Sequence, residues 1–323
     1  MFMPALKRFV PPPVWLAIKS VKRAILRVLR RTFELCGLNV ARRSDYYSPL
    51  PTESQLQRNV HRWNKPSSLA GISIDLQQLE HNFARLVQKW LPEFLTLPSY
   101  EQATQQGFGP GYPHFDAFTL YALLREYKPA RYLEVGSGLS TYYCSLAAAR
   151  NAREGRALQI ECIEPFPFPS LSSIPLIKLI QDEVQNVPIS TFQQLQAGDV
   201  LFIDSSHAVR IDSDVAYLLL EVLPALNSGV FVHIHDIPFP FNTPFPANQW
   251  VLGKEHYSPY WPIYWNEAML VQSFLAFNSS FEIIQSAPYI RHFDESFLLK
   301  NIPFYKTIAQ EPNTFSSLWI RRK

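Results

Sequence analysis

Short apolar segments alternate with helical segments from residue 131 onward, and this alternation limits the possible folds more than any other feature of the chain. The apolar segments are 131–135, 158–163, 176–180, 199–203 and 229–235. Helical periodicity lies between them, for example at 140–150 and 212–226. This order is typical of a parallel sheet covered by helices on both faces. We therefore predict an α/β fold, with 281–285 and 317–321 as a closing strand pair after a helix at 266–277.

Two further helices are predicted before the first strand. Residues 75–90 have helical spacing that stops at Pro92, and residues 115–127 form a second such segment before Pro129. A glycine-rich loop, 107–111, separates them. With 47% apolar and 18% charged residues in 323 positions, the chain is ordered, and no apolar run reaches the roughly 20 residues of a membrane span.

The amino-terminal segment carries the positive charge. Residues 1–43 hold ten Lys or Arg against Glu34 alone, a net charge of +9, so the remainder of the chain carries −6. A nucleic-acid-binding domain would carry its excess charge on the folded surface that meets the phosphates. We therefore expect no nucleic-acid partner.

Within that segment, residues 14–33 have apolar side chains at intervals of three and four, opposite basic ones. This pattern predicts a basic amphipathic helix, which either lies on an anionic membrane surface or covers the domain or a partner. Residues 44–74 are polar and without periodicity, and we predict a linker there, followed by one domain over 75–323. The three cysteines, Cys36, Cys144 and Cys162, have no paired spacing, which favours a cytoplasmic protein, with membrane association through the helix as an option.

The segment Leu133-Glu-Val-Gly-Ser-Gly-Leu-Ser-Thr141 is an apolar strand that enters a glycine turn and then a helix. Such a turn lets a ligand approach bare backbone at a helix N-terminus. A dinucleotide fingerprint would have glycine where Thr141 stands, and here the acidic Glu134 precedes the glycines. Glu164 ends the next strand, where a carboxylate accepts ribose hydroxyls. These features favour a nucleoside ligand other than a nicotinamide dinucleotide.

At these residues the chain resembles the class I S-adenosylmethionine-dependent methyltransferases. Three further segments resemble the bacterial subgroup called methyltransferase family 24: Gly198-Asp-Val-Leu-Phe-Ile-Asp-Ser-Ser-His207, Val232-His-Ile-His-Asp-Ile237 and Trp265-Asn-Glu267. The resemblance covers roughly residues 110–290. It implies a Rossmann-like, doubly wound sheet of seven strands, mostly parallel with an antiparallel final strand, and S-adenosylmethionine as the cosubstrate.

The resemblance also implies roles for individual residues. Gly136, Ser137 and Gly138 would hold the methionine part of the cofactor, with Glu134 nearby. Glu164 would take the ribose. Asp182 either contacts adenine or is a solvated loop carboxylate. Asp204 ends its strand facing the cleft, since ligands of open parallel sheets bind beyond the carboxyl ends of the strands.

Three residues are candidates for the chemical step. Methyl transfer requires an aligned acceptor and removal of its proton, and His207, His235 and Asp236 follow strand ends where that acceptor would lie. His233, deeper in its strand, is expected to be a satisfied core histidine. Related sugar and catechol methyltransferases bind magnesium through carboxylates at the ends of the fourth and fifth strands, where this chain has Asp204 and Asp236. Such sites have a second acid next to the one at the fifth strand, but here Ile237 follows Asp236. We therefore expect no metal.

Residues 238–265 contain six prolines and nine aromatic residues and are predicted to form a lid over the acceptor, or simply to pack on the domain. The favoured function is methylation of a small-molecule or glycan hydroxyl. Two alternatives stay open at this point: a non-catalytic membrane-surface interaction protein on a nucleoside-binding fold, and a nicotinamide-dependent oxidoreductase, which Thr141 disfavours.

Overall fold

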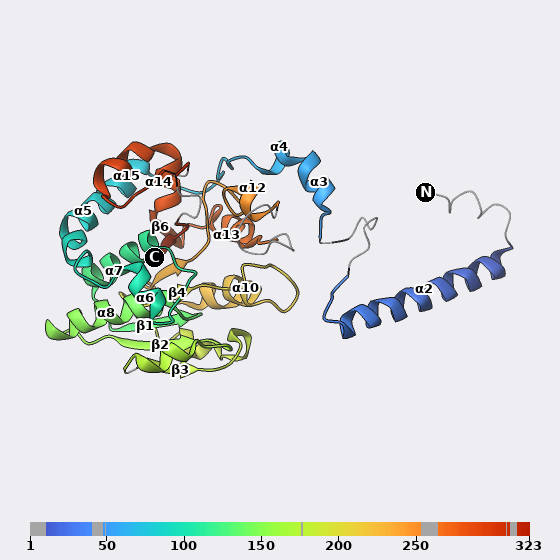
Figure 1. The fold of residues 1–323 in the computed structure, drawn as a ribbon, viewed down its shortest axis with the longest axis horizontal. Coiled ribbons are helices and arrows are strands. Elements are labelled where there is room, and N and C mark those ends of the chain that lie inside the picture. Colours follow the sequence, from blue (N-terminus) through green and yellow to red (C-terminus); the bar gives the residue numbers. More distant parts are fainter. Residues whose placement is uncertain are drawn as a thin grey trace. The chain divides into compact units, whose positions relative to one another are not determined.

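The computed structural model describes residues 11–40, 48, 50–175, 177–252, 264–307, 309–310 and 315–323. The chain forms two compact units, Met1–Arg58 and Asn59–Lys323, whose elements are labelled in Figure 1. The first unit contains helix α2 (Pro12–Leu35), which is amphipathic as predicted, and the short helix α3 (Glu53–Arg58). Among the described residues, no helix combines the length and the apolar character that a bilayer-spanning segment requires.

The second unit is built on one seven-stranded sheet in the order β3-β2-β1-β4-β5-β7-β6. Its strands are β1 (Arg131–Val135), β2 (Gln159–Ile163), β3 (Ile177–Ile180), β4 (Val200–Ile203), β5 (Phe231–Ile234), β6 (Phe281–Ser286) and β7 (Leu318–Arg322). The first five strands are parallel, and β7 is antiparallel to both β5 and β6. The predicted doubly wound, Rossmann-like sheet with an antiparallel final strand is confirmed.

Helices flank this sheet and precede it (Figure 1). The α-helices of the second unit are α4 (Val60–Trp63), α5 (Leu76–Phe94), α6 (Tyr100–Gln105), α7 (His114–Tyr127), α8 (Leu139–Arg153), α9 (Ile189–Phe192), α10 (Asp214–Tyr217), α11 (Leu223–Ala225), α12 (Ala247–Trp250), α13 (Glu267–Leu275), α14 (Ala287–Phe293) and α15 (Glu295–Asn301). Two short 3₁₀ turns, η1 (Pro169–Ser173) and η2 (Val184–Asn186), and a π-helical turn, η3 (Leu218–Val222), complete the elements.

Three predicted boundaries differ from the structure. Helix α5 continues past Pro92 to Phe94, because Leu91 and Phe94 are both buried in the core and packing outweighs the lost backbone donor. The helix expected over 212–226 is divided by the η3 turn ahead of Pro224, which has no N–H to donate. The second unit begins at Asn59, inside the segment expected to be a linker.

The central strands β4 and β5 are buried along their whole length, which explains why they are almost entirely apolar. In β1, Tyr132 packs into the core under α5, α7 and α8, whereas Leu133 and Val135 pack into the opposite core with α10 and α13. In β4, Phe202 joins the first core and Ile203 the second. Because β1 to β5 run parallel, their carboxyl ends lie at one edge of the sheet, where the site lies.

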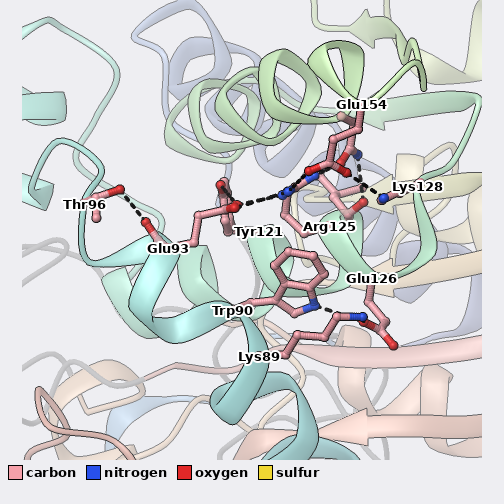
Figure 2. A network of polar contacts seen from close by, with 11 residues as sticks. Lys89, Trp90, Glu93, Thr96, Tyr121, Arg125, Glu126, Lys128 and Glu154 are labelled. Atoms are coloured by element: carbon pink, nitrogen blue, oxygen red, sulfur yellow. Dashed lines mark hydrogen bonds and ion pairs between the residues drawn. The ribbon is translucent and has the colours of Figure 1, made fainter.

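A buried arginine connects the helices on the first face. Arg125 of α7 is 2% exposed and lies 2.7 Å from Glu93 of α5 and 2.5 Å from Glu154 after α8. Figure 2 shows Arg125 between these two carboxylates. Its guanidinium also donates to Asn151 and lies over the ring of Trp90, 4.7 Å from the centroid. Its single positive charge is therefore paired with two carboxylates, and it connects α5, α7 and the end of α8.

Candidate active site

The turn between β1 and α8 requires glycine for steric reasons. Gly136 has φ +102°, and a Cβ there would lie 2.9 Å from the backbone oxygen of Asp204. Gly138 has φ +155°, and its N–H donates to Thr141 Oγ1 at 3.0 Å. The turn therefore brings the end of β1 against the end of β4 and leaves bare backbone facing the space between them.

Glu134 lies beneath this turn and does not line the cleft above it. Its carboxyl accepts from the hydroxyls of Ser140 and Thr141 and is fully buried. Burial raises its pKa to about 8, so that it is largely protonated at neutral pH. The structure places Glu134 as a support for the first turn of α8, directly beneath the glycine turn, and its expected position near the methionine part of a cofactor stays a prediction.

A cleft of about 340 Å³ opens at the carboxyl ends of the strands. Its lining includes most of the predicted site: Gly136, Ser137, Gly138, Glu164, Asp204, His207, His235 and Asp236. Glu164 is fixed there, because its Oε1 accepts from the N–H of Phe166 at 2.8 Å. Asp182 is exposed, accepts from Asn186 Nδ2 at 2.8 Å and is not among the lining residues.

A charged cluster closes the bottom of the cleft. His207 Nε2 lies 3.2 Å from Asp204 Oδ1 and 3.3 Å from Asp236 Oδ2, while Nδ1 lies 2.8 Å from Glu267 Oε2. These carboxylates raise the pKa of the buried His207 well above its ordinary value, against the effect of burial. His207 and Asp236 both have left-handed backbone, φ +57° and +55°, a conformation that costs energy outside glycine and concentrates at functional sites.

Sequence reasoning missed two acids of this cluster. Glu267 received no role, yet it is buried and engages His207 from α13. Asp116, fully buried in α7, lies 3.9 Å from His235 Nδ1, and the backbone N–H of Ser316 donates to its Oδ2 at 2.9 Å. Burial raises the pKa of Asp116. An acid in the apolar run of residues 114–124 is the signal that would have pointed to it.

The expectation for His233 was wrong in one respect. It is a core residue, fully buried and stacked on Phe202 with ring centroids 4.2 Å apart. However, neither ring nitrogen has a hydrogen-bond partner within the described part of the chain, so it is not satisfied. Burial lowers its pKa well below the ordinary value, and the neutral ring acts as an aromatic core residue.

The cluster also contains a donor set for a divalent ion. One ligand atom each from Asp204, His207 and Asp236 lies within 4.8 Å of the others. The sequence-based expectation of no metal considered only acids adjacent along the chain and did not consider His207 as a possible third ligand. Two carboxylate oxygens and an imidazole nitrogen fit Mn²⁺ or Zn²⁺ better than the all-oxygen shell that Mg²⁺ prefers.

A second cavity of about 470 Å³ adjoins the cleft. Asp236, Trp265, Pro110 and Gly111 line both spaces. Phe245 and Trp250, from the segment expected to be a lid, line the second cavity only, and Trp250 stacks on Trp265 at 6.1 Å. Three other aromatic residues of that segment, at positions 257, 260 and 261, lie outside the described residues.

The strand order, the glycine turn after β1 and the acidic ends of β2 and β4 together define a class I methyltransferase fold. Residues 133–237 match the family model described as a methyltransferase domain, methyltransferase family 24. This part of the chain is a class I, S-adenosylmethionine-dependent methyltransferase domain of the family 24 type, and it contains every site residue predicted from the sequence.

Two solved structures illustrate the similarity in fold. The methyltransferase PaMTH1 from Podospora anserina, solved with bound SAH, is 16% identical, with a TM-score of 0.37 over 86% of this chain and 99% of that chain. The O-methyltransferase TomG from Streptomyces achromogenes, involved in tomaymycin synthesis and solved with SAM, is 15% identical, with a TM-score of 0.37 over 78% and 91%. A search of curated proteins gives no match to this chain.

Proposed function

We propose that the protein transfers the methyl group of S-adenosylmethionine to a hydroxyl oxygen of a small-molecule acceptor. The observation that carries this proposal is the shared wall between the two cavities, formed in part by Asp236 and Trp265. Methyl transfer is an in-line displacement at sulfur, so donor and acceptor must meet at one boundary. A cofactor in the cleft and an acceptor in the second cavity would meet there.

The cleft supports a specific placement of the cofactor. The bare backbone of Gly136 and Gly138 admits its methionine part, which Ser137 would flank. Glu164, whose carboxylate is oriented by the N–H of Phe166, would accept the two ribose hydroxyls. Asp182 lies outside this cleft, and we assign it no contact with adenine.

Asp236 is the group that we propose to receive the proton of the acceptor. It faces both cavities, and Ser316 Oγ donates to its Oδ1 at 2.5 Å, which fixes the carboxylate. His207 has carboxylate oxygens at both ring nitrogens, so no lone pair is left to act as a base. We therefore assign His207 and His235 positioning roles, in place of the base role that the sequence suggested.

A divalent ion, where bound, would replace the proton on His207 Nε2, would be held by Asp204, His207 and Asp236, and would act as a Lewis acid on the acceptor oxygen. A chelator tests this directly. Loss of turnover on chelation, restored by Mn²⁺, would assign the cluster to an ion, whereas full turnover in the chelated enzyme would leave proton removal to Asp236.

Calorimetric titration with S-adenosylhomocysteine tests the cofactor site. Glu164→Ala should weaken its binding about tenfold to a hundredfold, because a charge-assisted hydrogen-bond acceptor of about 1.5–3 kcal/mol is lost. The matched control is Glu161→Ala on the same strand, whose carboxylate pairs with Lys178 at 2.9 Å and does not line the cleft. Unchanged affinity in Glu164→Ala, or binding of NAD in preference to S-adenosylhomocysteine, would refute the proposal.

Asp236→Asn tests the chemical step. With an acceptor in hand, turnover should fall by about a hundredfold to ten-thousandfold while the affinity for S-adenosylhomocysteine stays nearly unchanged. A parallel loss of cofactor affinity would show that Asp236 serves binding rather than proton removal.

A further inference from the structure

The second cavity is lined by a buried cation, Arg291, that forms no ion pair with the residues that the structure describes. Arg291 of α14 is 8% exposed and lines this cavity, where its guanidinium lies over Phe315, with Cζ 4.7 Å from the ring centroid. Its Nη1 is buried and has no hydrogen-bond partner among the described residues. Arg125, the buried arginine of α7, differs from Arg291 in this respect, because two glutamates pair with it at 2.7 and 2.5 Å.

Leaving a guanidinium buried and unpaired is costly, because the charge has lost water without gaining an anion. Burial lowers the pKa of Arg291 to about 10, so the side chain still carries its charge at neutral pH. Its pKa is raised slightly by longer-range electrostatic effects of Tyr305, Asp116 and Glu295. Within the described ranges, no ion pair joins it to a carboxylate. A desolvated cation that lines a cavity is suited to an anion supplied by a ligand.

We propose that the acceptor carries a carboxylate that pairs with Arg291, while its aromatic or apolar body packs against Phe245 and Trp250 and its hydroxyl reaches Asp236. This inference rests on the proposed function and adds the class of acceptor to it. The volume of about 470 Å³ accommodates a ring-sized ligand. A singly charged carboxylate is favoured over a phosphate, because Asp236 lines the same cavity and would repel a second negative charge.

The test uses the full chain saturated with S-adenosylhomocysteine and two pairs of probes that differ only in charge. The pairs are meta-hydroxybenzoate with meta-hydroxybenzamide, and meta-hydroxyphenylpropionate with its amide. Calorimetry should show at least one acid binding about tenfold or more tightly than its amide. Arg291→Met should remove this preference and Arg291→Lys should keep most of it, with the affinity for S-adenosylhomocysteine unchanged in both.

Equal affinities within both pairs, or failure of both acids to bind to the cofactor-loaded protein, would overturn the inference. The comparison of acid with amide in the unsubstituted chain stands even where Arg291→Met does not fold. The titration with S-adenosylhomocysteine is carried out first, so that failure of the proposed function can be distinguished from failure of the inference about Arg291. Loss of cofactor binding refutes the proposed function, and a preference for acid over amide in the cofactor-free chain still reports on Arg291.

Discussion

Replacing Glu134 with glutamine should change how the stability of the fold depends on pH. The pKa of this buried carboxyl is raised from 4.5 to about 8, mainly by desolvation, with the hydroxyls of Ser140 and Thr141 opposing the shift. Between these two pH values the folded protein keeps a proton that the unfolded chain has released. The contribution of Glu134 is therefore complete below pH 4.5 and is lost as pH rises toward 8.

The size of the effect follows from the shift. Each pH unit in that window lowers the free energy of unfolding by up to about 1.4 kcal/mol, which sums to an upper bound of about 5 kcal/mol. Glutamine cannot ionise, so the Glu134→Gln variant lacks this slope while its amide still reaches both hydroxyls. Urea unfolding of both proteins between about pH 5 and pH 8 should show the difference in stability moving in favour of the variant. Parallel curves would mean that Glu134 is ionised in the fold.

Three other substitutions test different parts of the molecule. Arg125→Met should lower the free energy of unfolding, measured in urea, by about 3–5 kcal/mol, because Glu93 and Glu154 lose their buried counter-ion. Arg321→Met breaks the exposed pair with Glu282 and should lower it by about 1 kcal/mol or less. Gly136→Ala should lower both stability and affinity for S-adenosylhomocysteine, by about 1–3 kcal/mol in stability, since φ there is +102°; an unchanged melting temperature would contradict the steric argument. Val21→Glu combined with Val28→Glu, on the apolar side of α2, should reduce co-sedimentation with anionic vesicles without changing cofactor affinity; equal sedimentation would exclude a membrane role for this helix.

The sheet was predictable because its strands are buried on both faces. Val200–Ile203 is an uninterrupted apolar run, and Phe231–Ile234 is apolar except for His233. Such segments between helices leave few alternatives to a parallel sheet. The end of α5 was not predictable from Pro92, because tertiary packing of Phe94 determines it. The insertion of β7 between β5 and β6 was not predicted, because the apolar pattern indicates a closing strand pair and not the order of its strands in the sheet.

In the site, residues that directly follow strands could be placed from the sequence. Glu164, Asp204 and Asp236 all lie at the cleft because the carboxyl ends of parallel strands share one edge. Side-chain alternation along β1 explains why Glu134, between Leu133 and Val135, points to the other face of the strand, toward α8, and does not line the cleft. Asp116 and Glu267 come from helices, and only tertiary structure brings them to the histidines.

The position of β7 determines how late the sheet can be completed while the chain is being synthesised. This strand follows the other six along the chain, yet it lies in the interior of the sheet, between β5 and β6. Just before it, Ser316 and Ser317 supply donors to Asp116, 200 and 201 residues earlier in the chain. As the chain leaves the ribosome, β5 and β6 therefore remain unpaired edges, open to wrong partners, until this segment emerges. The acidic residues around His235 reach their final arrangement only at that stage.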